Sequence, residues 1–247
     1  MGLSCVNQKM MDPEVLVDIP GELAMRFGER FETAAHRAMA GHGYFAMAIP
    51  GGSVAETILP VLLRARVDWS RVEVFWGDER AVPPEDPESN YAVAKRVWLD
   101  RVPLDPARIH RMQAERPDLD AAADAYAREF VRTLGGRPLD LVLLGMGPDG
   151  HVCSLFPGHP ALDEPERTVL PIRDSPKPPP TRMTLTLVAL AGAPLVCVAA
   201  FGAEKAAAAG GALESSTSRL PVALAARGGR SALFLLDPAA AGALARG

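Results

Sequence analysis

Four short apolar segments constrain the fold of this chain more than any other feature of its sequence. Each is bounded by glycine, proline or polar turn residues. Their residues are 44–49, 72–76, 139–144 and 195–201. Short, mainly apolar runs of this length are typical of strands buried on both faces of a parallel sheet. Helical patterns lie between them, at residues 54–66, 91–99 and 121–134. This alternation predicts a parallel sheet whose right-handed crossovers place helices on both faces.

The remaining segments give weaker signals. An amphipathic helix is expected over residues 22–40, where Leu23, Phe27 and Phe31 recur at helical spacing. The other expected elements are strands at 183–188 and 232–236, a helix at 203–213, a proline-rich connection at 171–180 and a closing helix after Asp237. We find no internal repeat and no break in composition. The prediction is a single-domain α/β fold over residues 13–247, with a Rossmann-like open sheet and a mobile leader at residues 1–12.

Composition excludes several classes of function. The chain has 247 residues, of which 48% are hydrophobic and 23% charged, so it can bury a substantial core. Its formal net charge of −4 gives no general attraction to nucleic acid or to an anionic membrane. No apolar run is long enough to span a bilayer. The cysteines Cys5, Cys153 and Cys197 are far apart, which fits a reducing compartment. We therefore expect a cytoplasmic protein, monomeric or weakly homo-oligomeric, whose partner is a small molecule rather than nucleic acid or membrane.

The loops after the apolar runs are the candidate sites, because ligands of open parallel sheets bind beyond the carboxyl ends of the strands. After the first run comes Pro50-Gly51-Gly52-Ser53, followed at once by a helix. Bare glycine amides at a helix start allow a phosphate to approach closely. The alternative is a tight turn in which Ser53 caps the helix.

The loop after the second run carries three charges, Asp78, Glu79 and Arg80. Charges at the end of a buried strand are costly without partners, which favours a functional cluster over a solvated loop. Arg80 can hold a carboxylate or a phosphate through two parallel hydrogen bonds. Ser89 and Asn90 add polar groups before the next helix, and they can cap that helix as well.

The loop after the third run carries the densest signal. Residues 145–151 read Gly-Met-Gly-Pro-Asp-Gly-His, and glycines such as Gly147 permit unusual backbone angles and close contact with a ligand. Asp149 and His151 supply a carboxylate and a base that the carboxylate can orient. The spacing of His151 from the next histidine and aspartate matches no familiar zinc pattern. We therefore expect a catalytic loop without a metal or another cofactor.

Two further cations, Arg182 and Lys205, stand at the ends of expected elements. Arg182 opens the strand expected at 183–188, and Lys205 stands near the start of the helix expected at 203–213. Such places are the usual neighbourhood of a bound anion, although either residue can instead be an ordinary surface charge.

Together these segments resemble the 6-phosphogluconolactonase family, the hydrolases of the second step of the oxidative pentose phosphate pathway. The matching motifs are Ile49-Pro50-Gly51-Gly52-Ser53, Gly77-Asp78-Glu79-Arg80, Ser89-Asn90-Tyr91, the segment 145–151 with Ser154-Leu155-Phe156-Pro157, Lys177-Pro178-Pro179-Pro180 with Arg182, and Gly202 with Lys205. They stand in the family's order and span nearly the whole chain. The resemblance implies the NagB/RpiA-like fold and hydrolysis of 6-phospho-D-glucono-1,5-lactone to 6-phosphogluconate.

Carried over position by position, the resemblance also implies a role for each matching residue. His151 is the general base, Asp149 its supporting carboxylate, and Asp78 and Arg80 contact the substrate. The other contacts to the substrate and its phosphate fall on Gly51, Gly52, Ser53, Asn90, Gly147, Arg182 and Lys205. The chain departs from the family where Ala191 replaces the usual Asn and where Cys153 replaces a small residue, and residues 220–234 match loosely.

The implied chemistry needs no covalent nucleophile. A δ-lactone is an activated ester, and the chain has no serine in a G-x-S-x-G elbow. Water activated by neutral His151 suffices, with the proton later returned to the departing ring oxygen. Either Arg80 or the loop amides around Gly147 and Gly150 can stabilise the oxyanion, and the sequence leaves both open.

Two rival functions share these motifs. Glucosamine-6-phosphate deaminases and related aldose–ketose isomerases have a similar loop, but carry an acidic residue where this chain has Phe156 and favour Tyr where it has Arg80. A non-catalytic sugar-phosphate sensor is the other rival. Intact Asp149 and His151, without an added DNA-binding segment, argue against it.

Overall fold

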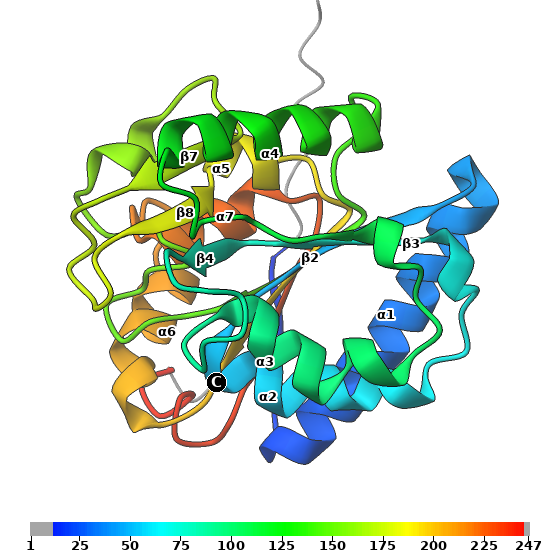
Figure 1. The fold of residues 1–247 in the computed structure, drawn as a ribbon. Coiled ribbons are helices and arrows are strands. Elements are labelled where there is room, and N and C mark those ends of the chain that lie inside the picture. The colour runs from blue at the N-terminus through cyan, green and yellow to red at the C-terminus, as the bar shows by residue number, and fades with distance from the viewer. Residues whose placement is uncertain (1–11, 245–247) are drawn as a thin grey trace, which may run out of the picture.

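An all-parallel sheet of seven strands forms the centre of the molecule in the computed structural model, which describes residues 12–244 (Figure 1). Across the sheet the strands are β1 (Glu14–Val17), β10 (Ala232–Leu236), β9 (Leu195–Ala200), β6 (Leu141–Gly145), β2 (Phe45–Ile49), β3 (Val72–Trp76) and β5 (Ile109–His110). The leader expected at residues 1–12 lies outside the described residues, apart from Asp12.

The four apolar runs form the middle of this sheet, as β2, β3, β6 and β9. Every residue of β2 and β3 is buried. β6 lies at the centre of the strand order, between β9 and β2, which confirms the predicted position of this run. Because parallel strands point the same way, the loops that follow them meet at one edge of the sheet.

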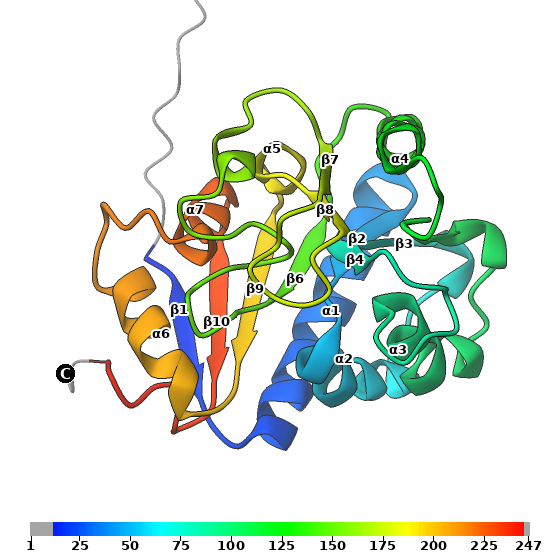
Figure 2. The same cartoon turned by 60° about the vertical axis from the view of Figure 1, so that its left-hand side comes forward.

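Helices cover both faces of the sheet (Figure 2). They are α1 (Pro20–His42), α2 (Gly52–Ile58), α3 (Asn90–Val97), α4 (Leu119–Leu134), α5 (Leu187–Leu190), α6 (Ala206–Leu213) and α7 (Pro221–Gly228). Phe31 of α1 packs edge-on against Phe45 of β2. Phe45 is aligned with Val72 of β3, and Phe75 lies three residues further on, so its side chain points to the opposite face. There it packs against Phe130 of α4, so α1 and α4 lie on opposite faces. None of the helices in residues 12–244 combines the length and apolar character needed to cross a membrane.

A second, antiparallel sheet brings charged residues to the loop edge of the main sheet. Its order is β4 (Asp78–Arg80), β8 (Arg182–Leu185) and β7 (Val169–Ile172). The strand expected at 183–188 is β8, which ends earlier because Thr186 caps α5. The register pairs Asp78 with Thr184 and Arg80 with Arg182. Three candidate site residues thus share two neighbouring strands.

Three expected elements differ from the structure. The helix expected at 54–66 is α2 up to Ile58 and then a 3-10 helix, because Pro60 has no N–H with which to continue the α-helix. The segment 203–213 begins as a 3-10 turn before α6. The closing helix predicted after Asp237 is wrong: the described residues 238–244 form turns, and the Asp237 carboxylate accepts the N–H of Ala240.

Candidate active site

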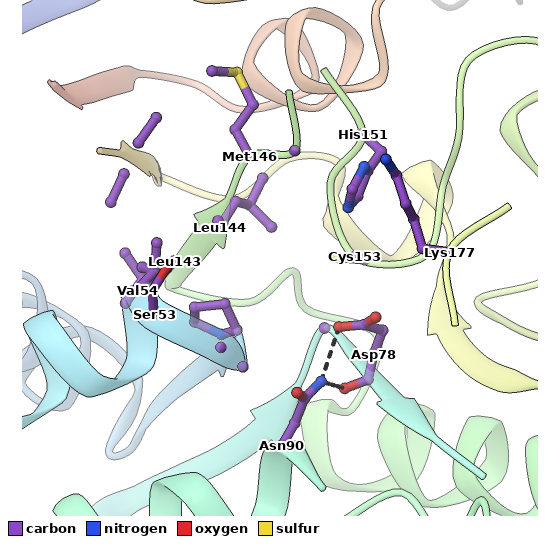
Figure 3. A pocket seen from close by; sticks show the side chains of 18 of the residues that line it. Ser53, Val54, Asp78, Asn90, Leu143, Leu144, Met146, His151, Cys153 and Lys177 are labelled. Carbon is purple, nitrogen blue, oxygen red and sulfur yellow. Dashed lines mark hydrogen bonds between the residues drawn. The ribbon is translucent and has the colours of Figure 1, made fainter. Parts of the chain in front are cut away.

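A pocket of about 340 Å³ lies at the carboxyl ends of β2, β3, β6 and β9 (Figure 3). It receives the loops after these strands and the edge of the second sheet. The predicted site residues that line it are Gly51, Gly52, Ser53, Asp78, Arg80, Asn90, Gly147, His151, Arg182 and Lys205. Ser53 and His151 therefore lie at the same edge of the sheet, as the sequence predicted. Asp149 lies behind the lining, bonded to His151.

His151 and Asp149 form a hydrogen-bonded pair. His151 Nδ1 lies 2.6 Å from Asp149 Oδ1, and the imidazole packs against Phe156 with ring centroids 4.7 Å apart. Burial alone raises the pKa of Asp149, but the hydrogen bond and charge of His151 outweigh burial and hold that pKa below its ordinary value. The carboxylate therefore accepts the Nδ1 proton, which leaves Nε2 of the neutral ring as the unprotonated nitrogen.

Gly147 allows the loop to fold tightly onto this pair. A Cβ at position 147 would lie 2.0 Å from His151 Nδ1 and 2.7 Å from Asp149 Oδ1. The Gly147 N–H donates to the carbonyl of His151 at 2.9 Å, and the Gly150 N–H donates to the carbonyl of Gly147 at 3.0 Å. Gly150 has a φ of +81°, which a side chain would strain. The loop thus fixes His151 through its own backbone.

Asp78 is a buried carboxylate with partners on three elements. Its Oδ2 accepts a hydrogen bond of 2.6 Å from Ser154 Oγ, and its Oδ1 accepts one of 3.2 Å from Asn90 Nδ2 (Figure 3). Arg182 Nη1 lies 3.8 Å from Oδ2. These contacts hold Asp78 in place at the pocket wall.

Glu79 points away from the pocket and supports the loop from behind. Its carboxylate accepts hydrogen bonds from the backbone of Asn90 and Tyr91 and from Ser89 Oγ. Burial raises the pKa of Glu79 although these hydrogen bonds oppose the rise. Ser89 also caps α3, as the sequence allowed. One charge of the predicted cluster is therefore structural.

The Gly51–Ser53 segment is an open turn at the start of α2. Gly52 has a φ of +61°. The N-cap residue of α2 is Gly51 and no side chain caps the helix, so the alternative in which Ser53 caps it is wrong. A Cβ on Gly51 would lie 1.6 Å from Asn90 Oδ1, an atom that is buried without a partner among the described residues. Asn90 therefore packs directly on this turn while its amide nitrogen holds Asp78.

The pocket is electropositive. Four cations line it, Arg80, Lys177, Arg182 and Lys205, beside the single carboxylate of Asp78. Arg80 donates from Nη1 to the carbonyl of Glu88, and its Nε is buried with no partner in the described chain. Such a surplus of positive charge suits a substrate that carries a phosphate. No cluster of three or more His, Cys, Asp or Glu side chains within residues 12–244 is arranged to hold a metal ion.

Two pocket residues with a charged or reactive side chain received no role from the sequence, although both lie in or beside matching motifs. Lys177 lines the pocket from the loop before β8. Cys153 lines it with a φ of +52°, and burial first, then the charge of Asp78, raises the pKa of its thiol. A thiol that stays protonated is a poor nucleophile, so Cys153 offers no covalent route. Only the tertiary contacts distinguish these residues from their neighbours.

The fold of the chain is of the NagB-like α/β class. A solved monomeric glucosamine-6-phosphate deaminase of this superfamily matches with a TM-score of 0.79 and 19% identity over 94% of this chain and 100% of that one. At this identity the likeness shows the fold alone.

Sequence relatives define the family. A family model described as glucosamine-6-phosphate isomerases/6-phosphogluconolactonase matches residues 19–234. The 6-phosphogluconolactonase of Streptomyces coelicolor is 41% identical over 249 residues, which cover 95% of each chain. The rat 6-phosphogluconolactonase is 38% identical over 90% of each chain. The solved 6-phosphogluconolactonase of Trypanosoma brucei matches with a TM-score of 0.80 and 27% identity over 95% of this chain and 99% of that one. The chain belongs to the glucosamine-6-phosphate isomerase/6-phosphogluconolactonase family.

Proposed function

We propose that this chain is a carboxylic ester hydrolase that converts 6-phospho-D-glucono-1,5-lactone to 6-phosphogluconate in the oxidative pentose phosphate pathway. The observation that carries the proposal is the His151–Asp149 pair, held by a glycine loop at the wall of a pocket with four cations. Its relatives of about 40% identity bear the name of this activity. The reaction needs water and no cofactor.

His151 acts as the general base in this proposal. Its Nε2 takes a proton from a water molecule while the water oxygen attacks the lactone carbonyl carbon. Asp149 keeps the proton on Nδ1 and stabilises the imidazolium that forms. When the bond between the carbonyl carbon and the ring oxygen breaks, Nε2 returns its proton to that oxygen. The products are the open-chain hydroxyl and a carboxylic acid, which then ionises.

The phosphate and the sugar hydroxyls take the rest of the pocket. Lys205 and the turn around Gly52 and Ser53 lie on either side of β6, because β9 and β2 are its two neighbours in the sheet. A lysine and open backbone amides are the groups that bind phosphate in proteins. Asp78, fixed by Ser154 and Asn90, can accept a hydrogen bond from a sugar hydroxyl.

The site chemistry favours hydrolysis over the rival functions. Phe156 packs on the His151 ring, where an acidic residue would serve ring opening in a deaminase. A regulator that only senses sugar phosphates has no need for an oriented base. Here His151 is oriented by the hydrogen bond of 2.6 Å between its Nδ1 and Asp149 Oδ1. These contacts support a lactonase.

The test is a direct assay on purified protein. The initial rate of acid release from freshly made 6-phospho-D-glucono-1,5-lactone is measured at neutral pH, with the spontaneous rate subtracted. The proposal expects a rate far above background and no ammonia release from glucosamine 6-phosphate. Ammonia release without lactone hydrolysis would favour the deaminase.

We also propose that the protein works in the cytoplasm. The scattered cysteines support a reducing compartment, and the two that the structure describes, Cys153 and Cys197, are both free thiols. A monomeric or weakly associated state stays a prediction, which sedimentation of the purified protein would test.

A further inference from the structure

Lys177 is a pocket cation whose charge the proposed mechanism has not used. Of the lysines that the structure describes, Lys95 and Lys205 pair with carboxylates of their own segments, whereas Lys177 has no ion pair. Its side chain lines the pocket. An ammonium group has three N–H donors and no acceptor, so Lys177 offers three donors to a ligand.

The backbone that carries Lys177 is held unusually firmly. The Lys177 carbonyl accepts hydrogen bonds from Ser175 Oγ at 2.8 Å and from Arg182 Nη2 at 3.1 Å. Arg182 also donates from Nη2 to the carbonyl of Pro178 at 2.8 Å and from Nε to that of Pro179 at 2.9 Å. A buried guanidinium thus binds three successive carbonyls. The loop is fixed before any substrate arrives, so little reorganisation is needed in the reaction.

These contacts give Arg182 a different role from the one its charge alone suggests. Its Nε and Nη2 groups donate hydrogen bonds to the carbonyls of the loop. Its Nη1 lies 3.5 Å from Ser154 Oγ and 3.8 Å from Asp78 Oδ2. Burial lowers the pKa of Arg182, an effect that the charge of Asp78 partly offsets. Arg182 is therefore a positioning residue for the Lys177 loop.

The Lys177 loop and His151 are linked through Arg182 and Phe156, and both Lys177 and His151 line the pocket. The Arg182 guanidinium carbon lies 6.0 Å from the Phe156 ring centroid, and the His151 ring packs on Phe156 at 4.7 Å. In Figure 3 the Lys177 side chain extends toward His151, whereas Ser53 lies across the pocket. Lys177 is thus directed to the side of the pocket that holds the proposed base, away from the turn proposed to bind the phosphate.

The glycine N–H donors suggested by the sequence are already engaged. The Gly147 N–H donates to the His151 carbonyl, and the Gly150 N–H donates to the Gly147 carbonyl. Arg80 donates one hydrogen bond from Nη1 to the Glu88 carbonyl and keeps an Nε without a partner in the described chain, so it is a second available donor. A donor for the developing negative charge must be free and aimed at the carbonyl oxygen.

We propose that Lys177 stabilises the oxyanion of lactone hydrolysis, an inference that rests on the proposed function. As water attacks and His151 takes its proton, the carbonyl π electrons move to the carbonyl oxygen, which accepts a hydrogen bond from the Lys177 ammonium. The electrons return to re-form the carbonyl when the bond to the ring oxygen breaks. Lys177 donates a hydrogen bond but transfers no proton, and the proton of the attacking water passes through His151 to the ring oxygen.

The test compares Lys177→Ala with Lys205→Ala on two substrates, 6-phospho-D-glucono-1,5-lactone and D-glucono-1,5-lactone. Loss of one oxyanion donor typically lowers kcat by about 100- to 1000-fold. We expect Lys177→Ala to lower kcat by about this factor with little change in KM, and to lower kcat/KM for both lactones equally. Lys205→Ala should instead raise KM for the phosphorylated lactone and reduce the preference for it. Lys177→Arg, which keeps a charged donor, should recover part of kcat.

Melting curves show whether each variant is folded, and Lys95→Ala, an exposed lysine on α3, controls for loss of a surface charge. A double variant of Arg182→Gln and Lys177→Ala tests the positioning role. Its kcat should fall by less than the product of the factors by which Arg182→Gln and Lys177→Ala lower kcat separately, because part of the loss in Arg182→Gln acts through Lys177. A Lys177→Ala enzyme with kcat within about threefold of wild type, or one that loses only its preference for the phosphorylated lactone, overturns the proposal. If wild type hydrolyses neither lactone above background, the proposed function fails first and the inference falls with it.

Discussion

Substitution of Gly147 by Ala should misplace His151, the proposed general base, without replacing any of the proposed catalytic side chains. The added Cβ would lie 2.0 Å from His151 Nδ1 and 2.1 Å from Cε1, whereas ordinary contacts begin at 3.4 Å. The ring must therefore retreat by about 1.4 Å, and a misplacement of about 1 Å can cost about 100-fold in rate. We expect kcat on the phosphorylated lactone to fall by about 100-fold.

Steady-state kinetics with the spontaneous rate subtracted measure this effect. Gly21→Ala is the matched control, because a Cβ there, at the start of α1, meets nothing within 4 Å. Its kcat should equal that of wild type. Folded Gly147→Ala with an unchanged kcat would show that the ring tolerates displacement, and the argument from this loop would then be wrong.

Two further predictions concern charge. Lys205→Ala should raise KM more than it lowers kcat, because the phosphate is held throughout the reaction. Equal kcat/KM of the wild type on the phosphorylated and the non-phosphorylated lactone would refute this role of Lys205. Burial lowers the pKa of His110, but its hydrogen bonds to Glu73 and Glu129 outweigh burial and raise it above 6.5. The charged ring then stabilises the fold fully below about pH 6.5 and loses that contribution as pH rises through the raised pKa. In urea unfolding, His110→Gln should lower the free energy of unfolding more at about pH 6 than at about pH 9, and an equal loss at both would contradict the assignment.

The central sheet could be predicted from the sequence because its strands are buried on both faces. β2, β6 and β9 contain only apolar residues and glycine, and β3 has one charged residue, Glu73, which pairs with Arg108 and His110, so burial accounts for the pattern. The second sheet has no such pattern. β4 is Asp-Glu-Arg, a strand only because β8 pairs with it, and β7 contains a proline at the second sheet's edge. The predicted closing helix failed because Gly242 interrupts the alanines after one turn, although Asp237 and Pro238 suit a helix start.

The candidate site was predictable where a loop follows a strand along the chain. The residues after β2, β3 and β6 reach one edge by topology, so their side chains meet in one pocket. Lys177 could not be assigned in this way. Its position depends on Arg182, whose guanidinium binds the carbonyls of the Lys177 loop, and no local pattern records that contact.

The turnover number of His151→Ala tests the account most directly. Loss of a general base should lower kcat by about 100- to 10,000-fold in a protein that still melts as a folded domain. Asp149→Asn should cost less, because it disturbs the orientation and charge of the ring but leaves the base in place. If folded His151→Ala still hydrolyses the phosphorylated lactone at the wild-type rate above background, the base lies elsewhere and the mechanism is contradicted.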